Sequence, residues 1–370
     1  MGADLEVGPL QPEVIPIGLM LSAEGLREHQ KLSAEHVTFS LTEACPLRCA
    51  HCIVATVPVV DRSRTMPLSR AEAYAAQLPD LVRRGVRLVS FTGGEPLLAR
   101  RQLTVLSTAA AAAGCDVTVV TSAHWATSPQ SAARVIASLP GVRYWHLSTD
   151  TYHLPFVGLE RVIWAAKAAL EAGREVMIRL TVPSEPTAAC LDIHRRLRSE
   201  LPEAPVFCQN VIGMGRASEG GDRPPISTSG RSWPCIPNSM VVRFDGSIGP
   251  CCAGLVDTRD SHPFQYPNAD DIRLEGAHRA WSTDPLLQLI RAAGFDAVMG
   301  WLDEIAPDNP VVADPPAHPC DLCVRLWDDP VIAPALRERA SRPENVRKIA
   351  ELTRVVFGET FMMEEGEPCS

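Results

Sequence analysis

Three cysteines lie close together near the start of the chain, in the segment Cys45-Pro-Leu-Arg-Cys49-Ala-His-Cys52. In a chain without an export signal, cysteines at this spacing are more typical of metal binding than of disulfides. Three thiolates on one tight loop can bind three corners of an iron–sulfur cube, whereas a structural zinc or cluster site normally has a fourth protein ligand. The segment therefore predicts a cluster with one iron open to another ligand.

A second, looser group of cysteines follows after residue 213. Its members are Cys235, Cys251, Cys252, Cys320 and Cys323. Four of these thiols can form a closed ligand shell, and the same spacings suit either an iron–sulfur cluster or a zinc ion. The adjacent thiols of Cys251 and Cys252 compete for one corner of such a site.

The elements that must position these residues follow a regular order between residues 36 and 212. Short β-branched runs alternate with amphipathic helical stretches, and the predicted strands are His36–Leu41, Val86–Phe91, Val117–Ser122, Tyr144–Thr149, Glu175–Val182 and Val206–Ile212. This alternation predicts a parallel sheet. Six units are fewer than the eight of a full barrel, so we expect an α/β fold, a partial (β/α)6 TIM-like barrel, with its chemistry at the C-terminal strand ends.

Local signals predict where several helices begin and end. Ser69 with Glu72 forms a capping box that predicts a helix ending before Gly85. Gly114 and Gly173 predict the ends of two later helices.

The character of the sequence changes after residue 213. Residues 213–234 are rich in Gly, Pro, Ser and Arg, which is typical of a linker. Two short strands around Asp245-Gly246 predict a hairpin, and a helix is expected near Pro285–Ala293. We therefore predict an N-terminal extension over residues 1–35, the barrel over 36–217, a small α+β domain over 218–330 and a helical tail over 331–370.

The cysteine loop after the first strand resembles the signature of the radical S-adenosylmethionine (radical SAM) superfamily. Thr92-Gly93-Gly94-Glu95-Pro96, at the end of the second strand, is similar to the Gly-Gly-Glu stretch of that family. Ser148-Thr-Asp150, at the end of the fourth strand, is similar to a Ser-x-Asp near its cofactor. The resemblance extends from residue 36 to Gly215-Arg216-Ala217.

This resemblance implies that Cys45, Cys49 and Cys52 bind a [4Fe-4S] cluster whose open iron holds SAM. It implies that the Gly93-Gly94-Glu95 stretch meets the SAM amino group, since glycines permit close approach and a carboxylate suits an ammonium. The remaining residues that it places at the cofactor are His51 (through its backbone), Ser148 and Asp150, while Arg179 pairs with the SAM carboxylate or the substrate. Thr121-Ser122 departs from the family, where many relatives have an Asn.

The second cysteine group resembles the C-terminal SPASM and twitch extensions of radical SAM enzymes. A full SPASM domain needs further cysteines soon after Cys320-x2-Cys323, and none follows until Cys369. The count is similar to the shorter twitch type, which implies one auxiliary [4Fe-4S] cluster on Cys235, Cys251, Cys320 and Cys323. The spacing of Gly246 and Cys251 favours Cys251 over Cys252. A four-cysteine zinc site is the alternative.

The resemblance implies hydrogen abstraction by a 5′-deoxyadenosyl radical, and two substrate classes compete. One is a sugar, aminocyclitol or nucleoside intermediate of natural-product biosynthesis that is oxidised or epimerised. The other is a ribosomal peptide, although residues 1–35 are too few for a leader-binding domain. An epimerisation needs a hydrogen donor, and Cys208 near the end of the sixth strand is the candidate. A non-enzymatic iron–sulfur sensor or zinc scaffold is the third alternative.

Composition limits the partners further. The net charge is −9 with no long basic run, which disfavours nucleic-acid and anionic-membrane partners. No apolar stretch reaches the length of a membrane span, and the acidic N-terminus does not resemble a secretory signal. We therefore expect a cytoplasmic protein whose partners are its substrate and a flavodoxin- or ferredoxin-type reductant.

Overall fold

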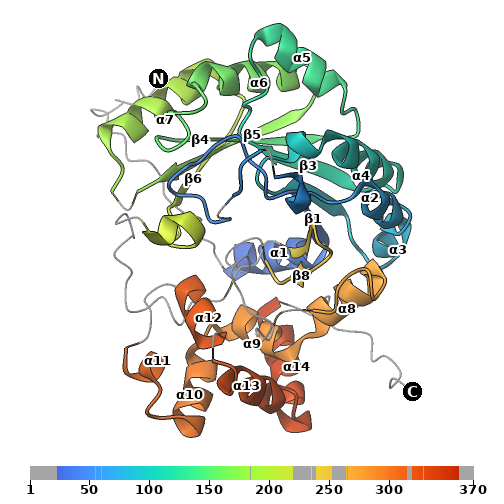
Figure 1. Cartoon of the computed structure of the whole chain (residues 1–370). Coiled ribbons are helices and arrows are strands. Elements are labelled where there is room, and N and C mark those ends of the chain that lie inside the picture. The colour runs from blue at the N-terminus through green and yellow to red at the C-terminus, as the bar shows by residue number, and fades with distance from the viewer. Residues whose placement is uncertain are drawn as a thin grey trace, which may run out of the picture.

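The computed structural model describes residues 23–54, 56–59, 61–183, 185–219, 235, 239–251, 264, 266–314, 319–327 and 329–357. Six parallel strands form a curved sheet, as expected (Figure 1). They are β1 (His36–Ser40), β2 (Leu88–Thr92), β3 (Asp116–Thr121), β4 (Tyr144–Thr149), β5 (Glu175–Val182) and β6 (Val206–Asn210). Strands that follow one another in the chain are neighbours in the sheet. The predicted α/β partial barrel is therefore confirmed.

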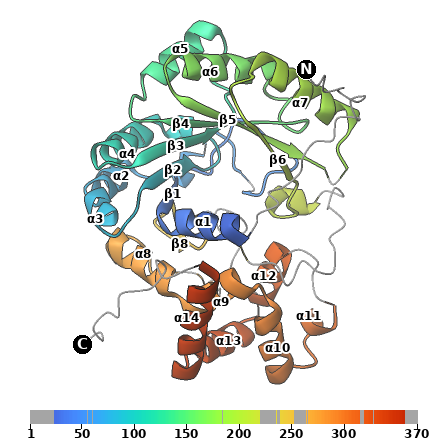
Figure 2. The ribbon, with the colours of Figure 1, turned by 180° about the vertical axis from the view of Figure 1, so that it is seen from behind.

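Helices cover the outer face of this sheet (Figure 2). They are α2 (Leu68–Ala75), α3 (Leu78–Arg83), α4 (Arg100–Ala112), α5 (Pro129–Ala137), α6 (Leu159–Glu171) and α7 (Ala188–Glu200). Short 3-10 helices follow the cysteine loop, β2 and β6, namely η1 (Arg62–Arg64), η2 (Pro96–Ala99) and η3 (Gly215–Glu219). Glycines follow α3, α4 and α6 where the sequence predicted helix ends.

The first predicted helix is divided in two, and its predicted capping box is wrong. Pro67 occupies the N-cap of α2 and no side chain caps that helix, because Ser69 already lies inside it. The break between α2 and α3 coincides with Pro79 in the first turn of α3. A proline there has no N–H for the preceding turn, which ends one helix and suits the start of the next.

The predicted hairpin is present, but it belongs to the barrel sheet. β7 (Met240–Arg243) pairs antiparallel with β8 (Ile248–Gly249) and parallel with β1. An open edge strand exposes unpaired backbone groups, and β7 covers that edge of β1. The hairpin predicted within residues 218–330 is therefore continuous with the barrel sheet, because the segment after the barrel returns to the barrel's first strand.

The remainder of the C-terminal region is helical where the structure describes it. Its helices are α8 (Leu274–Thr283), α9 (Pro285–Ala293), α10 (Asp296–Ile305), α11 (Pro310–Ala313), α12 (Pro319–Trp327), α13 (Ile332–Ala340) and α14 (Pro343–Phe357). Helices α9–α14 gather below the barrel in Figure 1. None of the described helices combines the length and the apolar composition that a membrane span requires.

The predicted N-terminal extension contains a helix that joins the two regions. Figure 2 shows α1 (Ala23–Ala34) between the barrel and the C-terminal helices. The Arg27 guanidinium on α1 donates to the carbonyl of Val356 on α14 over 3.1 Å. Helix α1 thus connects the barrel with the C-terminal helices. The domain boundaries predicted above stay a prediction.

Candidate active site

A cavity of about 510 Å³ lies at the C-terminal ends of the barrel strands. Its wall contains the thiol residues Cys45, Cys49 and Cys52 and also Cys251, which follows β8. Each barrel strand contributes a hydroxyl or amide side chain, namely Ser40, Thr92, Thr121, Ser148, Thr181 and Gln209. Residues from both cysteine groups thus line one cavity.

The cysteine loop leaves β1 and is bonded back to itself. The backbone N–H of Cys45 donates to the carbonyl of Val57 over 3.0 Å, and that of Cys52 donates to the carbonyl of Cys49 over 3.2 Å. Burial raises the pKa of Cys45 to about 12, and the charges of Glu95, Cys49 and Cys52 add to this effect. Three neighbouring thiolates repel one another unless a cation lies among them. The iron ions of an iron–sulfur cluster, to which the three thiolates would be ligands, meet this need.

Gly215 and Arg216, at the start of η3, contact the backbone of this loop. The Arg216 guanidinium donates to the carbonyls of Cys49 (3.0 Å) and Thr56 (3.1 Å), and its backbone N–H donates to that of Cys52 (2.9 Å). Gly215 has a φ of +55°, and a Cβ there would lie 2.5 Å from the carbonyl oxygen of Ile53. The sequence had marked Gly215-Arg216-Ala217 as a family feature, without a role.

The Gly93-Gly94 pair packs directly against the chain that enters the cysteine loop. The N–H of Gly94 donates to the carbonyl of Thr42 (2.5 Å), and the N–H of Glu95 donates to that of Ala44 (2.9 Å). A Cβ on either glycine would come under 3.0 Å from these carbonyls. The glycines are therefore needed for close backbone contact, and both also line the cavity.

The Glu95 carboxylate lies beneath the cavity wall rather than in it, with 1% of the residue exposed. It accepts hydrogen bonds from the hydroxyls of Thr121 and Ser122, both 2.7 Å, and His124 Nδ1 lies 3.5 Å away. Burial raises the pKa of Glu95, but His124 and the two hydroxyls outweigh burial and lower it overall. Thr121-Ser122, where this chain departs from the family, thus serves as the support of Glu95.

Replacing Ser122 with alanine should lower the free energy of unfolding by about 1–3 kcal/mol, because a buried carboxylate loses one donor. Urea unfolding followed by circular dichroism measures this change. Ser63→Ala is the matched control, since Ser63 also donates to a carboxylate, that of Asp61, but at an exposed position. Equal effects of the two substitutions would contradict the proposed support.

Asp150 organises the end of β4 and is fully buried. One of its oxygens accepts from the backbone N–H groups of Tyr152 and His153, both 2.9 Å, which caps the following turn. His153 Nδ1 lies 2.9 Å from the same oxygen, and His51 Nε2 lies 3.4 Å from the other. His51 also stacks on Tyr152 with ring centroids 4.8 Å apart. Asp150 therefore joins the cysteine loop to β4.

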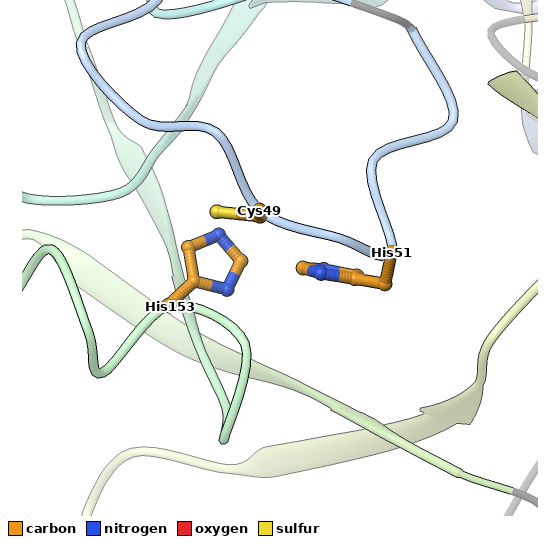
Figure 3. A group of neighbouring side chains, drawn as sticks. All are labelled: Cys49, His51 and His153. Carbon is orange, nitrogen blue, oxygen red and sulfur yellow. The ribbon is translucent and has the colours of Figure 1, made fainter. Parts of the chain in front are cut away.

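Cys49, His51 and His153 converge closely (Figure 3). Their ligand atoms all lie within 4.8 Å of one another, and they are the one such group of potential metal ligands among the described residues. Burial lowers the pKa of His51 to about 4, outweighing the nearby Asp150 carboxylate. This group offers a Cys–His–His metal site as an alternative to the three-cysteine cluster, and only Cys49 belongs to both.

Arg179 on β5 lies in the cavity wall, where its guanidinium donates to Gln209 Oε1 over 3.0 Å. Among the described residues no carboxylate pairs with it, because Glu175 pairs instead with Arg143. Arg179 is therefore placed to meet an anionic group in the cavity.

Cys208 lies away from the cavity wall. Successive strand residues point to opposite faces, so Cys208 faces away from the side on which Gln209 lines the cavity. Burial, and then the neighbouring Cys190 of α7, raises the pKa of Cys208 to about 11. This placement does not support its predicted role as hydrogen donor, because the thiol has no access to the cavity.

Glu43, a buried carboxylate that no sequence pattern singles out, links β7 to the cysteine loop. Glu43, just before that loop, is 2% exposed and pairs with Arg243 at the end of β7 (2.8 Å) and with Arg64. All three residues line the cavity. The pairing depends on β7 lying beside β1, which sequence periodicity does not reveal.

The described members of the second cysteine group lie on three segments that are distant in the sequence. Burial raises the pKa of Cys323 well above its ordinary value, and the charges of Cys235 and Cys251 act in the same direction. Cys320 precedes Cys323 by three residues on α12, and residues at this spacing share a helix face. Cys252 lies outside the described residues. Cys235 and Cys251 are thus close enough to Cys323 to act on its charge, which is compatible with a metal or cluster ligand set.

Comparison with known proteins agrees with this geometry. Residues 39–197 match the model of the radical SAM superfamily. A GTP 3′,8-cyclase of Chlorobaculum tepidum is 34% identical over 119 residues, which cover 32% of this chain and 34% of that protein. A GTP 3′,8-cyclase of Rhodopseudomonas palustris is 28% identical over 160 residues, or 40% of this chain and 44% of that protein. The chain thus matches less than half the length of these relatives, and the similarity to the radical SAM superfamily is to the domain formed by residues 39–197.

Proposed function

We propose that this enzyme binds a [4Fe-4S] cluster on Cys45, Cys49 and Cys52, with SAM on the open iron. The main observation in its support is that these thiols line the same cavity as Gly93 and Gly94 and the hydroxyl and amide side chains at the strand ends. When bound, the cluster and SAM supply a 5′-deoxyadenosyl radical that removes hydrogen from a substrate. The barrel residues orient the reactants and exclude water.

The second cysteine group would hold an auxiliary [4Fe-4S] cluster on Cys235, Cys251, Cys320 and Cys323. Support comes from the electrostatic effect of Cys235 and Cys251 on the Cys323 thiol and from the position of Cys251 in the cavity wall. A cluster at Cys251 would exchange electrons with a substrate in the cavity. This arrangement suits a net oxidation, because the auxiliary cluster can accept the electron left on the substrate.

The substrate proposed is a small polar metabolite of the sugar, aminocyclitol or nucleoside class. Pockets of several hundred cubic ångströms suit metabolite-sized ligands, and SAM would fill part of the 510 Å³. Hydroxyl and amide groups at every barrel strand end offer hydrogen bonds to such a ligand. The GTP 3′,8-cyclase relatives favour the nucleoside member of this class.

Anaerobic reconstitution with iron and sulfide, followed by dithionite and SAM, tests the proposal. We expect 5′-deoxyadenosine to form only when both dithionite and SAM are present, as measured by liquid chromatography. Protein that holds zinc without iron, or that leaves SAM intact under reduction, would refute it. Adding GTP, aminosugars or peptides separately then tests the substrate class, since the correct class should accelerate SAM cleavage.

A further inference from the structure

We propose that Arg291 is the buried cation of the auxiliary-cluster site, and that it raises the reduction potential of the cluster bound there. This inference rests on the proposed function, because it requires an auxiliary cluster. Three observations carry it: the burial of Arg291, its hydrogen bonds, and the two thiol-bearing segments that its partners hold.

Arg291 lies in the last turn of α9 and has no exposed surface. Its Nε and Nη2 donate to the side-chain oxygen of Gln30 on α1 over 2.8 and 2.6 Å. Its guanidinium carbon lies 5.1 Å from the ring centroid of Trp281 on α8, which is within cation–π range. The charge is therefore fixed between α1 and the pair α8 and α9, which are distant from α1 in the sequence.

The partners of Arg291 hold the cysteine segments. Gln30 Nε2 donates to the carbonyl of Cys235 over 3.1 Å, and the N–H of Cys235 donates to the carbonyl of Ile290 over 3.0 Å. Trp281 Nε1 donates to the carbonyl of Pro250, next to Cys251, over 3.2 Å. Gln30 thus connects Arg291 to the backbone of Cys235, and Trp281 connects it to the backbone next to Cys251. Both cysteines are proposed cluster ligands.

The charge of Arg291 persists in this environment. An arginine guanidinium keeps its proton in proteins at neutral pH, so Arg291 carries a positive charge. A cation acts strongly on nearby charges where the effective dielectric constant is low. Since reduction adds an electron to a thiolate-bound cluster, a neighbouring cation favours the reduced form, and surrounding charge sets cluster potentials.

Redox titration of the reconstituted enzyme, monitored by electron paramagnetic resonance, tests this role. The auxiliary signal is assigned as the one retained in a Cys45→Ala/Cys49→Ala/Cys52→Ala variant. In that background Arg291→Met removes the charge, and at the original midpoint we expect the ratio of reduced to oxidised cluster to fall about tenfold. That fall corresponds to about 59 mV for one electron.

Arg339→Met is the matched control, because Arg339 also lies over a tryptophan, Trp301, at 5.2 Å, but is partly exposed and paired with Glu304. It should leave the potential unchanged, and Arg291→Lys should keep it near the original value. A fully loaded Arg291→Met protein with an unchanged midpoint would overturn the proposal.

A second variant covers the case in which Arg291→Met does not fold or bind its cluster. Gln30→Glu is isosteric and places a carboxylate against the guanidinium, so the midpoint should again fall, and an unchanged midpoint would likewise overturn the proposal. If the parent protein holds no second cluster at all, the auxiliary-cluster part of the proposed function fails instead. The two failures are therefore distinguishable.

Discussion

Replacing Cys45, Cys49 and Cys52 together with alanine should reduce SAM cleavage to the background level. A cluster without its three thiolates cannot be held at the cavity, and the 5′-deoxyadenosyl radical then has no source. Iron content and 5′-deoxyadenosine formation measure the effect, and circular dichroism should show an unchanged fold. The matched control removes three buried cysteines outside the cavity wall, Cys115, Cys190 and Cys208.

Single substitutions separate the cluster from the Cys49–His51–His153 alternative. A cluster needs Cys45 and Cys52, so Cys45→Ala alone should lose most SAM cleavage. A Cys–His–His site would tolerate that substitution and would instead lose its metal in His51→Ala/His153→Ala. Activity that survives Cys45→Ala but not the double histidine change would contradict the proposed cluster.

Arg216→Met should produce the next largest loss, because it removes the donors that hold the carbonyls of Cys49 and Thr56. Hydrogen bonds to a charged group contribute roughly 1.5–3 kcal/mol each, and about 1.4 kcal/mol corresponds to a tenfold change in an equilibrium constant. We therefore expect at least a tenfold weaker retention of the first cluster, measured as iron released to a chelator over time.

Two further variants make that result specific. Arg134→Met, at an exposed position on α5, should retain iron as the parent protein does. Gly215→Ala should release iron faster than the parent protein, as Arg216→Met does. The added Cβ would collide with the Ile53 carbonyl, and residue 215 has a positive φ. If the iron of Arg216→Met is released at the parent rate, η3 does not hold the cysteine loop.

The local parts of the site could be predicted because each lies within a few residues of a recognisable strand end. The cysteine loop follows β1 directly, Gly93-Gly94 follows β2, and Ser148-Thr-Asp150 ends β4. Parallel strands bring their C-terminal ends to one side of a sheet. Knowing the order of elements was therefore enough to expect these three segments around one cavity.

Sequence patterns were not sufficient where the orientation of a side chain or a partner distant in the sequence matters. Cys208 is near the end of β6, but strand alternation directs it away from the cavity. Glu95 has the residue type expected for binding an ammonium, yet Thr121 and Ser122 engage its oxygens below the wall. Ser69 and Glu72 have the spacing of a capping box, but the helix begins before them.

The sequence alone was thus enough to predict the α/β barrel, the radical SAM resemblance and the three-cysteine loop, because these depend on periodicity and on spacings of a few residues. Tertiary structure alone decided that β7 pairs with β1, so that Glu43 meets Arg243 and Cys251 reaches the cavity. It also decided that Arg216 holds the cysteine loop. These contacts join residues well over a hundred positions apart, and they form because an open sheet edge and buried carbonyls and carboxylates need partners that only the folded chain supplies.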